Sequence, residues 1–351
     1  MEYKHIRDID LASSINSRVF AIFMARDVEV RLQKDGTTKY INLNICDKDF
    51  KIDAKKFGAS ESEIEMMKSG CIYRGAIDVK EYAKSPTGYS CIIYNFEPHD
   101  ESPSNFVEWA DGMDRAQNNV QHALNSISES IYSNLVANII IPIWDKFAVW
   151  TAASSCHHDI LGGLLVHTGE VIEQAEQIAD LWEDRYGPNF INKELLLSAA
   201  LLHDVGKIEE LSVDASSGST EYSITAALEN HITIGATKVE IEAYKLGIGY
   251  QEYETLATGE TIKKKSTEQL ESEKEAVRVL KHCILAHHGK KEYGSPIDMN
   301  CPEALILNIA DNLSAEMYRY SKNFKKMEAS SSHTTWLNGT MLVTYKDSTK
   351  E

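Results

Sequence analysis

The chain has 351 residues, 43% of them hydrophobic and 25% charged, and a formal net charge of -17. These proportions are typical of globular proteins, and the length allows two domains that each bury a core. Residues 1–9 carry charges and no apolar signal segment, and no apolar run reaches the ~18 residues that a membrane-spanning helix needs. We therefore expect a cytoplasmic protein with no membrane partner.

The negative charge is unevenly distributed along the chain. Residues 1–100 contain 15 Lys and Arg against 16 Asp and Glu, whereas residues 101–351 contain 21 against 37. Because polyanions bind to Lys and Arg, the first part can approach a nucleic acid. The acidic remainder repels a phosphate backbone except where bound cations reverse the local sign.

The N-terminal part of the chain has the pattern of β structure. Alternating or β-branched segments, which are typical of strands, cover residues 18–24, 28–32, 40–46, 50–53, 71–79 and 89–96. Turn sequences separate them, and residues 60–68 have a helical pattern. Short strands with one helical insert predict a five-stranded β-barrel of the OB type over residues 1–100.

Barrels of this type bind single strands through stacked aromatic rings and a basic groove. The candidate substrate contacts in this part are Arg26, Tyr40 and Arg74. The alternative is that most aromatic rings of the segment form the barrel core. The rings in question are Tyr40, Phe50, Phe57, Tyr73, Tyr82, Tyr89 and Tyr94.

After residue 100 the apolar residues recur at helical spacing, which predicts an all-α bundle. We expect a helical linker over residues 101–155, with helices at 107–131 and 135–150, the second interrupted by Pro142. The main helical domain is expected at 156–325 and a polar tail at 326–351. Residues 212–222 predict a surface loop, and 250–275 a polar, charged insertion.

The most informative motif of the helical domain is the pair His203-Asp204, which follows the apolar helix 195–202. Further imidazoles and carboxylates lie inside apolar helical patterns before and after it. The candidate metal ligands are His167, His203, Asp204, His231, His287, His288 and Asp311. Any one histidine taken alone is more often a core or surface residue than a ligand. As a set on separate apolar helices, they indicate a metal centre.

Asp311 illustrates the physical reason for this prediction. It lies between Ile306, Ile309 and Leu313 on a predicted helix, and these apolar neighbours are expected to bury it. A buried carboxylate costs several kcal/mol unless it is paired or coordinated, so coordination explains it.

Two divalent ions can be assigned to these ligands. His167, His203, Asp204 and Asp311 suit one ion, Mn²⁺ first and Fe²⁺, Co²⁺ or Ni²⁺ as alternatives, and the other histidines suit a second ion, with Asp204 as the bridge. Two ions about 3.5–4 Å apart stabilise the attacking and leaving oxygens of a phosphoryl transfer and activate a water. The pattern therefore predicts hydrolysis of phosphoesters.

Five residues are predicted to act beside or with the ions. Asp204, Lys207 and His288 form the predicted catalytic set. Lys207 either neutralises a phosphate or is a cation at a helix C-terminus. His157 and His158 either contact substrate at the mouth of the site, as Lys207 does from within it, or form an exposed pair.

At these residues the sequence resembles the HD-domain metal-dependent phosphohydrolases, whose pattern H…HD…D is met by His167, His203-Asp204 and Asp311. Across nearly the whole chain it is similar to the YhaM-type 3′-to-5′ exoribonucleases, which join an OB barrel to an HD domain. The matching stretches are residues 157–168, 199–207, 230–235, 284–296 and 304–313. The insertion at 250–275 and the tail depart from that family.

The resemblance implies removal of nucleotides from the 3′ end of a single-stranded nucleic acid, RNA favoured over DNA, usually supported by manganese or cobalt. Two alternatives remain open. One is a hydrolase of small linear or cyclic nucleotides whose barrel is an interaction module, and the other is a strand-binding adaptor with a vestigial metal site. Assembly into a homo-oligomer is also left open.

Overall fold

A computed structural model describes residues 2–48, 50–85, 87–102, 105–154, 157–215, 218–329, 334–337 and 339–343. The chain divides into two compact units. One comprises Met1–Trp109 with Val213–Ser219, and the other Ala110–Ser212 with Thr220–Glu351. Each unit has its own hydrophobic core, so each is described by itself.

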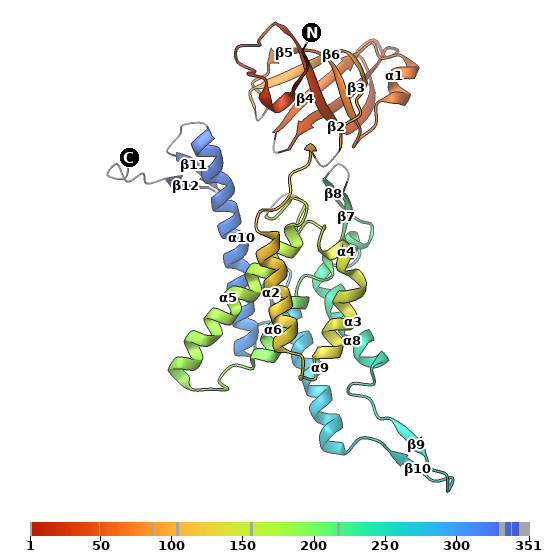
Figure 1. Ribbon diagram of the computed structural model, residues 1–351, viewed down its shortest axis with the longest axis vertical. Helices are drawn as coiled ribbons and strands as arrows, with labels where there is room; N and C mark the ends of the chain where they lie inside the picture. Colours follow the sequence, from red (N-terminus) through yellow and green to blue (C-terminus); the bar gives the residue numbers. More distant parts are fainter. Residues whose placement is uncertain are drawn as a thin grey trace. The chain divides into compact units, whose positions relative to one another are not determined.

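The first unit is a closed barrel of five strands, as the sequence predicts (Figure 1). Its strands are β2 (Arg18–Leu32), β3 (Lys39–Asp47), β4 (Phe50–Phe57), β5 (Ile72–Glu81) and β6 (Tyr89–Pro98). They pair in the order β2-β3-β4-β6-β5, and β5 pairs with β2 to close the barrel. A short strand β1 (Lys4–His5) adds in parallel to β2, and helix α1 (Glu61–Met66) lies between β4 and β5 in sequence. This is the OB arrangement.

Strand β2 differs from its prediction because it is one strand rather than two. Its ladder to β3 shifts register between Arg26 and Glu29, which is a β-bulge, and Asp27 there has a φ of 53°. The Asp27 carboxylate accepts hydrogen bonds from the side chains of Asn44 at 2.7 Å and Lys51 at 2.8 Å. The bulge bends the strand without ending it, so the interruption in the sequence pattern is a bulge and not a turn.

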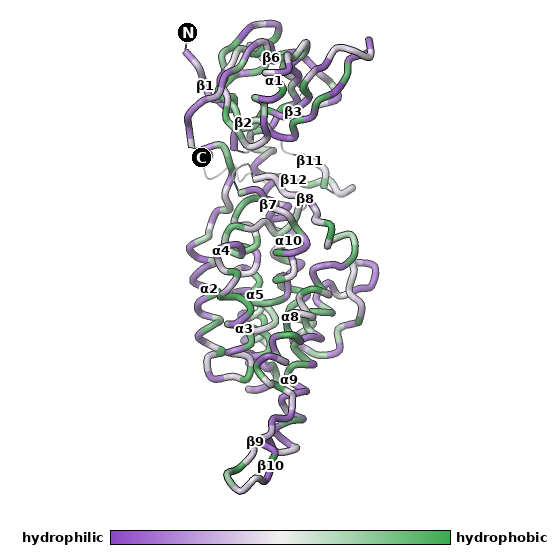
Figure 2. The backbone as a smooth tube through the Cα atoms, turned by 90° about the vertical axis from the view of Figure 1, so that its right-hand side faces the viewer, coloured by the Kyte–Doolittle hydropathy of each residue, from purple (hydrophilic) through white to green (hydrophobic). Residues whose placement is uncertain are grey.

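The second unit is a bundle of helices around one core. Its helices are α2 (Met113–Ser126), α3 (Ser133–Ile140), α4 (Trp144–Phe147), α5 (Gly163–Tyr186), α6 (Lys193–Leu202), α7 (Lys207–Glu210), α8 (His231–Lys245), α9 (Thr267–Ala286) and α10 (Pro302–Ala329). Hydrophilic and hydrophobic stretches alternate along most of them in Figure 2, as expected for helices that bury one face. Within the described residues, none of the helices has both the length and the apolar composition that crossing a bilayer requires.

Helices α2 and α3 lie in the segment predicted as a linker, yet their buried side chains belong to the same core as those of α5 and α6. Single 3-10 turns occur at Ile6–Asp8, Ile141–Ile143, Thr225–Ala227 and Lys291–Tyr293. The segment predicted as a surface loop at 212–222 instead contributes to a hairpin of β7 (Leu211–Asp214) and β8 (Ser219–Tyr222).

Two further hairpins decorate the helical unit. The polar insertion contains β9 (Tyr253–Thr255) and β10 (Thr261–Lys263), followed by the first turns of α9. The predicted tail begins inside the last turn of α10 and continues into β11 (Thr334–Leu337) and β12 (Thr340–Val343). Its end, at 344–351, lies outside the described residues.

Candidate metal centre

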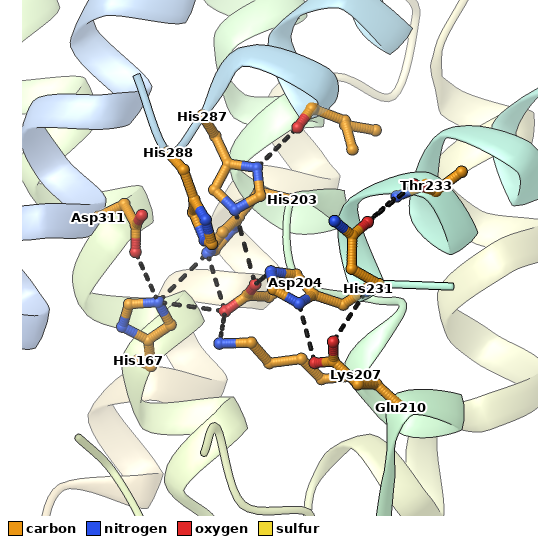
Figure 3. Close-up of polar contacts among 12 residues, drawn as sticks. His167, His203, Asp204, Lys207, Glu210, His231, Thr233, His287, His288 and Asp311 are labelled. Atoms are coloured by element: carbon orange, nitrogen blue, oxygen red, sulfur yellow. Dashed lines mark hydrogen bonds and ion pairs between the residues drawn. The ribbon is translucent and has the colours of Figure 1, made fainter. Parts of the chain in front are cut away.

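The structure brings all of the predicted metal ligands together, from five helices (Figure 3). His167 comes from α5, His203 and Asp204 from the end of α6, and His231 from the first position of α8. His287 and His288 follow α9, and Asp311 lies on α10. The site therefore requires the whole bundle to be folded.

Local sequence explains why α6 and α8 begin and end where they do. Asn192 and Asn230 are N-caps, and their side-chain oxygens accept hydrogen bonds from the backbone N–H groups of Leu195 and Thr233 at 3.0 Å. The cap at Asn230 makes His231 the first residue of α8. The position of this imidazole is thus set by the helix start.

Two glycines allow backbones to approach at the site. A Cβ built on Gly206 would lie 2.1 Å from the carbonyl oxygen of His231, and one on Gly163 would lie 2.0 Å from the carbonyl oxygen of His158. No side chain fits at either distance. These glycines hold the turn after Asp204 against α8, and the segment before α5 against α5.

Asp204 lies between two groups of histidines. Its Oδ2 is 3.4 Å from Nε2 of His167 and 3.4 Å from Nε2 of His203. Its Oδ1 is 3.5 Å from Nε2 of His231 and 3.8 Å from Nε2 of His287. Each oxygen of this one carboxylate therefore faces a different group, which is the geometry of a bridge.

The groups are completed by His288 and Asp311. Asp311 Oδ1 lies 3.1 Å from His167 Nε2. The ligand atoms of His167, His203 and Asp311 all lie within 4.8 Å of one another, and so do those of His231, His287 and His288. Ligands bonded at about 2.0–2.2 Å to one ion are separated by about 3–3.5 Å, so the spacing suits ions.

Every histidine of the set has its other ring nitrogen engaged. Nδ1 of His203 donates to the carbonyl oxygen of Ala200 at 2.8 Å, and Nδ1 of His287 donates to that of Ile284 at 2.7 Å. Nδ1 of His288 donates to the carbonyl oxygen of Tyr293 at 2.7 Å. Since a carbonyl can only accept, Nδ1 carries the hydrogen, and in the neutral ring Nε2 presents its lone pair to the centre.

The other two histidines are held by Glu210 and by Ser314 with Glu170, which the sequence analysis missed. Nδ1 of His231 donates to Glu210 at 2.8 Å, and the His231 backbone N–H donates to the same carboxylate at 3.1 Å. Nδ1 of His167 donates to the hydroxyl of Ser314 at 2.9 Å, which in turn donates to Glu170 at 2.7 Å. Glu170 lies one helical turn after His167, the only sequence signal that could have pointed to it.

The residues present fit a cation between them. Nε2 of His231, Nε2 of His287 and Oδ1 of Asp204 are buried and have no hydrogen-bond partner among the described residues. Buried polar atoms are normally satisfied, and leaving them without a partner is costly. Imidazole nitrogens and carboxylate oxygens together suit Mn²⁺, Fe²⁺, Co²⁺ or Ni²⁺.

The pKa shifts of the ligands follow from their burial and from the charges that face one another at the site. Burial by itself raises the pKa of Asp204, but Lys207 and His203 outweigh it and hold that pKa well below its usual range. Burial lowers the pKa of His167, yet its contacts with Asp204 and Asp311 prevail and raise it to about 9. Burial lowers the pKa of His287 and of His288. The carboxylates thus attract positive charge to this point, which a proton or a metal ion supplies.

Lys207 points into the cluster. Its side chain is buried, and Nζ lies 2.7 Å from Oδ2 of Asp204 (Figure 3). This contact favours the first interpretation of Lys207, a charge beside the ions, over a cation at a helix end.

His157 and His158 both lie beside His167. Their rings are 5.3 Å and 5.2 Å from the His167 ring, centroid to centroid. His158 is 1% exposed and stacks on Tyr318 at 4.3 Å, so the exposed-pair alternative does not hold for it. Burial lowers the pKa of His157 to about 2. Both rings can therefore offer neutral donors or lone pairs next to the centre.

The barrel residues are not gathered in the same way. Arg26 lies on β2 itself, Arg74 pairs with Ile22 of β2, and Tyr40 pairs with Arg31 of β2. The three residues therefore lie in different rows across the sheet. Successive strand residues are about 3.3 Å apart, so the rows spread over most of the strand. The structure therefore places the three on one unit without forming a cluster.

One face of β2, β3 and β4 nevertheless carries aromatic and basic side chains. Tyr40 and Phe57 pair across β3 and β4, with ring centroids 5.6 Å apart, and Phe57 is 44% exposed. Lys51 and Lys55 extend on the same side of β4, where alternate residues are exposed. Of the rings considered as core, Tyr73 is fully buried, whereas Tyr82 and Tyr94 are exposed.

The chain is similar in sequence to one domain family and to a group of named nucleases. The HD domain family matches residues 164–316, a range that contains every predicted metal ligand. The 3'-5' exoribonuclease YhaM of Bacillus velezensis is 32% identical over 183 residues, 52% of this chain and 48% of that protein, and its Bacillus subtilis counterpart is 31% identical over the same shares. The Listeria innocua protein of that name is 29% identical over 231 residues, 64% of this chain and 63% of the relative. The chain thus spans about half the length of the Bacillus relatives it matches, and the resemblance seen in the sequence is confirmed over about half of this chain.

Proposed function

Because the chain carries an HD domain and is similar to the YhaM exoribonucleases, we propose that it is a metal-dependent phosphodiesterase that removes nucleotides from the 3′ end of single-stranded RNA. The observation that carries the proposal is the position of Asp204. Its two oxygens face two separate groups of imidazole Nε2 atoms. A dinuclear site of this kind suits the cleavage of phosphate esters.

The residues that would hold the ions divide at Asp204. His167, His203 and Asp311 serve one position, and His231, His287 and His288 serve the other. Two divalent ions, of which Mn²⁺ is the preferred candidate, would neutralise charge on the phosphate when bound and lower the pKa of a bound water. The remaining catalytic tasks belong to side chains of the chain itself.

Those side chains act by position and charge. Lys207, bonded to Asp204, places an ammonium where negative charge develops on a phosphate. His288, half-buried at the edge of its group, is held by the hydrogen bond from its Nδ1 to the carbonyl oxygen of Tyr293, which directs its Nε2 to the second metal position. His157, which is half-buried beside His167, is placed to contact the terminal nucleotide, whereas the buried His158 packs against Tyr318 and supports His167.

The substrate proposal rests on the barrel and on the relatives. The exposed Phe57 and the half-buried Tyr40 beside it offer rings on which bases can stack, and Lys51 and Lys55 on the same side can pair with phosphates. The relatives are named 3'-5' exoribonucleases, which favours RNA and this polarity. Both features favour a strand over a small nucleotide.

The test is digestion of a 5′-labelled single-stranded RNA with Mn²⁺ present, beside DNA of the same sequence. We expect a ladder that shortens one nucleotide at a time from the 3′ end, faster for RNA, and no products from Asp204→Ala. Full activity of Asp204→Ala, or hydrolysis confined to dinucleotides and cyclic nucleotides, would contradict the proposal.

A further inference from the structure

The helical unit contains a second hollow that shares no residue with the metal centre. It has a volume of about 670 Å³ and lies between α8 and α9. Gly249, Tyr250 and Lys274, which bracket the β9–β10 insertion, line it together with residues of α9. Figure 1 shows this hairpin at the start of α9. A volume of this size suits a small organic ligand.

The polar side of the cavity is cationic. Lys274, Arg278 and Lys281 line it from successive turns of α9, and Lys274 forms an exposed ion pair with Glu271 at 2.9 Å, which a phosphate can replace. The carboxylate of Glu240, also in the lining, is already bonded to Nζ of Lys281 at 2.6 Å and to the hydroxyl of Tyr250 at 2.7 Å. Arg278 is exposed and forms no ion pair with any described residue. In a unit with a large excess of acidic residues, this cavity offers a free guanidinium.

Much of the remaining lining of the cavity is apolar. Ile248, Val277, Leu285 and Ile297 line it. Tyr250 lies at its edge with 38% of its surface exposed. A ligand that fills the cavity must therefore have an apolar or aromatic body as well as a negative charge.

Two further groups can form hydrogen bonds with the edge of a planar ligand. Nε2 of His282 accepts the backbone N–H of Asn300 at 3.0 Å, so the hydrogen of the neutral ring is on Nδ1, which can donate. Burial lowers the pKa of His282, which keeps the ring neutral. The Asn300 side-chain amide is exposed and offers both a donor and an acceptor.

We propose that this cavity binds a nucleoside monophosphate, with the phosphate on Arg278 and Lys274 and the base over the apolar wall against His282 and Asn300. An aromatic ring with donors and acceptors on its edge, joined to a doubly charged phosphate, satisfies both sides of the cavity at once. Inorganic phosphate lacks the body, and a nucleoside lacks the charge. The site does not depend on the hydrolysis proposed above.

Calorimetric titration of the full chain tests the proposal. The Asp204→Ala variant is used so that the probe is neither turned over nor held by an intact metal centre. We expect adenosine monophosphate to bind, with adenosine and inorganic phosphate each weaker by about tenfold or more. No heat with adenosine monophosphate at millimolar concentration, or equal affinity for inorganic phosphate, would overturn the proposal.

Variants of the cavity locate the binding. In the same background Arg278→Glu is expected to weaken binding by about tenfold or more, and Ile297→Trp, which fills the apolar side, to weaken it without a change of charge. The control is Arg185→Glu, an exposed charge reversal on α5 outside the cavity, for which binding is unchanged. Affinity unaffected by both cavity variants would place the nucleotide elsewhere and refute the proposal.

Discussion

The metal centre and the barrel face use charge in opposite ways. At the centre, His203, Asp204 and His287 are at most 2% exposed, and each histidine is oriented by a hydrogen bond to its second nitrogen. On the barrel, Arg74 pairs with Glu97 and Lys51 with Asp27 in exposed contacts. Exposed ion pairs are worth about 0–1 kcal/mol, so a phosphate can replace the carboxylate. The difference teaches that the candidate metal centre has a fixed geometry, which the proposed cleavage requires, whereas the barrel face has exchangeable contacts, which suit the proposed binding of a strand.

The largest expected effect breaks the metal centre alone. Asp311→Asn keeps the shape of the side chain but removes a charge that lies 3.1 Å from His167. We expect hydrolysis to fall by about 10³-fold, since ligand loss removes several kcal/mol of transition-state stabilisation. Strand binding, measured by fluorescence anisotropy, is expected to stay unchanged. Asp298→Asn, an exposed change in the same unit, is the control, and an equal loss there would refute a specific role.

Removal of metal extends the comparison of the two units to their thermal stability. A ligand present at 100 times its Kd adds about 2.7 kcal/mol to the folded state, so chelation is expected to lower the Tm of the helical unit by about 5–10 °C. The barrel has no share in the ligand set, and its Tm is expected to stay constant. Scanning calorimetry with and without a chelator measures both. A helical transition that does not respond would argue against a structural contribution from metal.

The support of His231 gives a smaller effect. Glu210→Gln weakens the acceptor that holds both the ring and the backbone N–H of His231. Loss of such a supporting contact typically costs about 10–100-fold in metal affinity or activity. Glu209→Gln is the matched control, because this neighbouring carboxylate pairs with Lys238 away from the centre. Metal titrations followed by activity compare the two, and identical curves would remove Glu210 from the account.

The smallest effect is expected on the barrel. Replacing Tyr40 and Phe57 with Ala removes one stacking platform, with a loss at the lower end of the ~1–3 kcal/mol typical of a stacked base. Anisotropy with a labelled RNA should show the weaker Kd, while hydrolysis of a dinucleotide stays constant. Tyr82→Ala removes an exposed ring elsewhere on the barrel and serves as control. A loss of dinucleotide hydrolysis in the double variant would mean that the barrel acts on the chemistry itself.

Much of the site could be predicted because its ligands interrupt apolar helices, and that signal is local in sequence. The cause of the burial of Asp311 nevertheless differs in part from the prediction. Asp311 is buried, with 8% of its surface exposed, but Ile309 and Leu313 beside it are 44% and 45% exposed. The carboxylate is buried because its face of α10 packs into the bundle, while those two neighbours lie on the other face.

The supporting residues could not be predicted for a different reason. Glu210 and Ser314 lie 21 and 147 residues from the histidines they contact, and nothing local distinguishes them from other polar residues. The barrel shows the same limit. The alternation of apolar residues predicts its strands, but in sequence the bulge at Asp27 resembles the end of a strand. Only the pairing of β2 with β3 before and after the bulge shows that the strand continues.

The central claim is that Asp204 joins two metal positions, and metal content per chain tests it most directly. After loading with Mn²⁺ and removal of free metal, elemental analysis of the wild-type protein is expected to give about two ions per chain, and Asp204→Asn about one or fewer. Circular dichroism confirms that the variant is folded. Fewer than one ion in the wild type, or two retained in Asp204→Asn, would contradict the account.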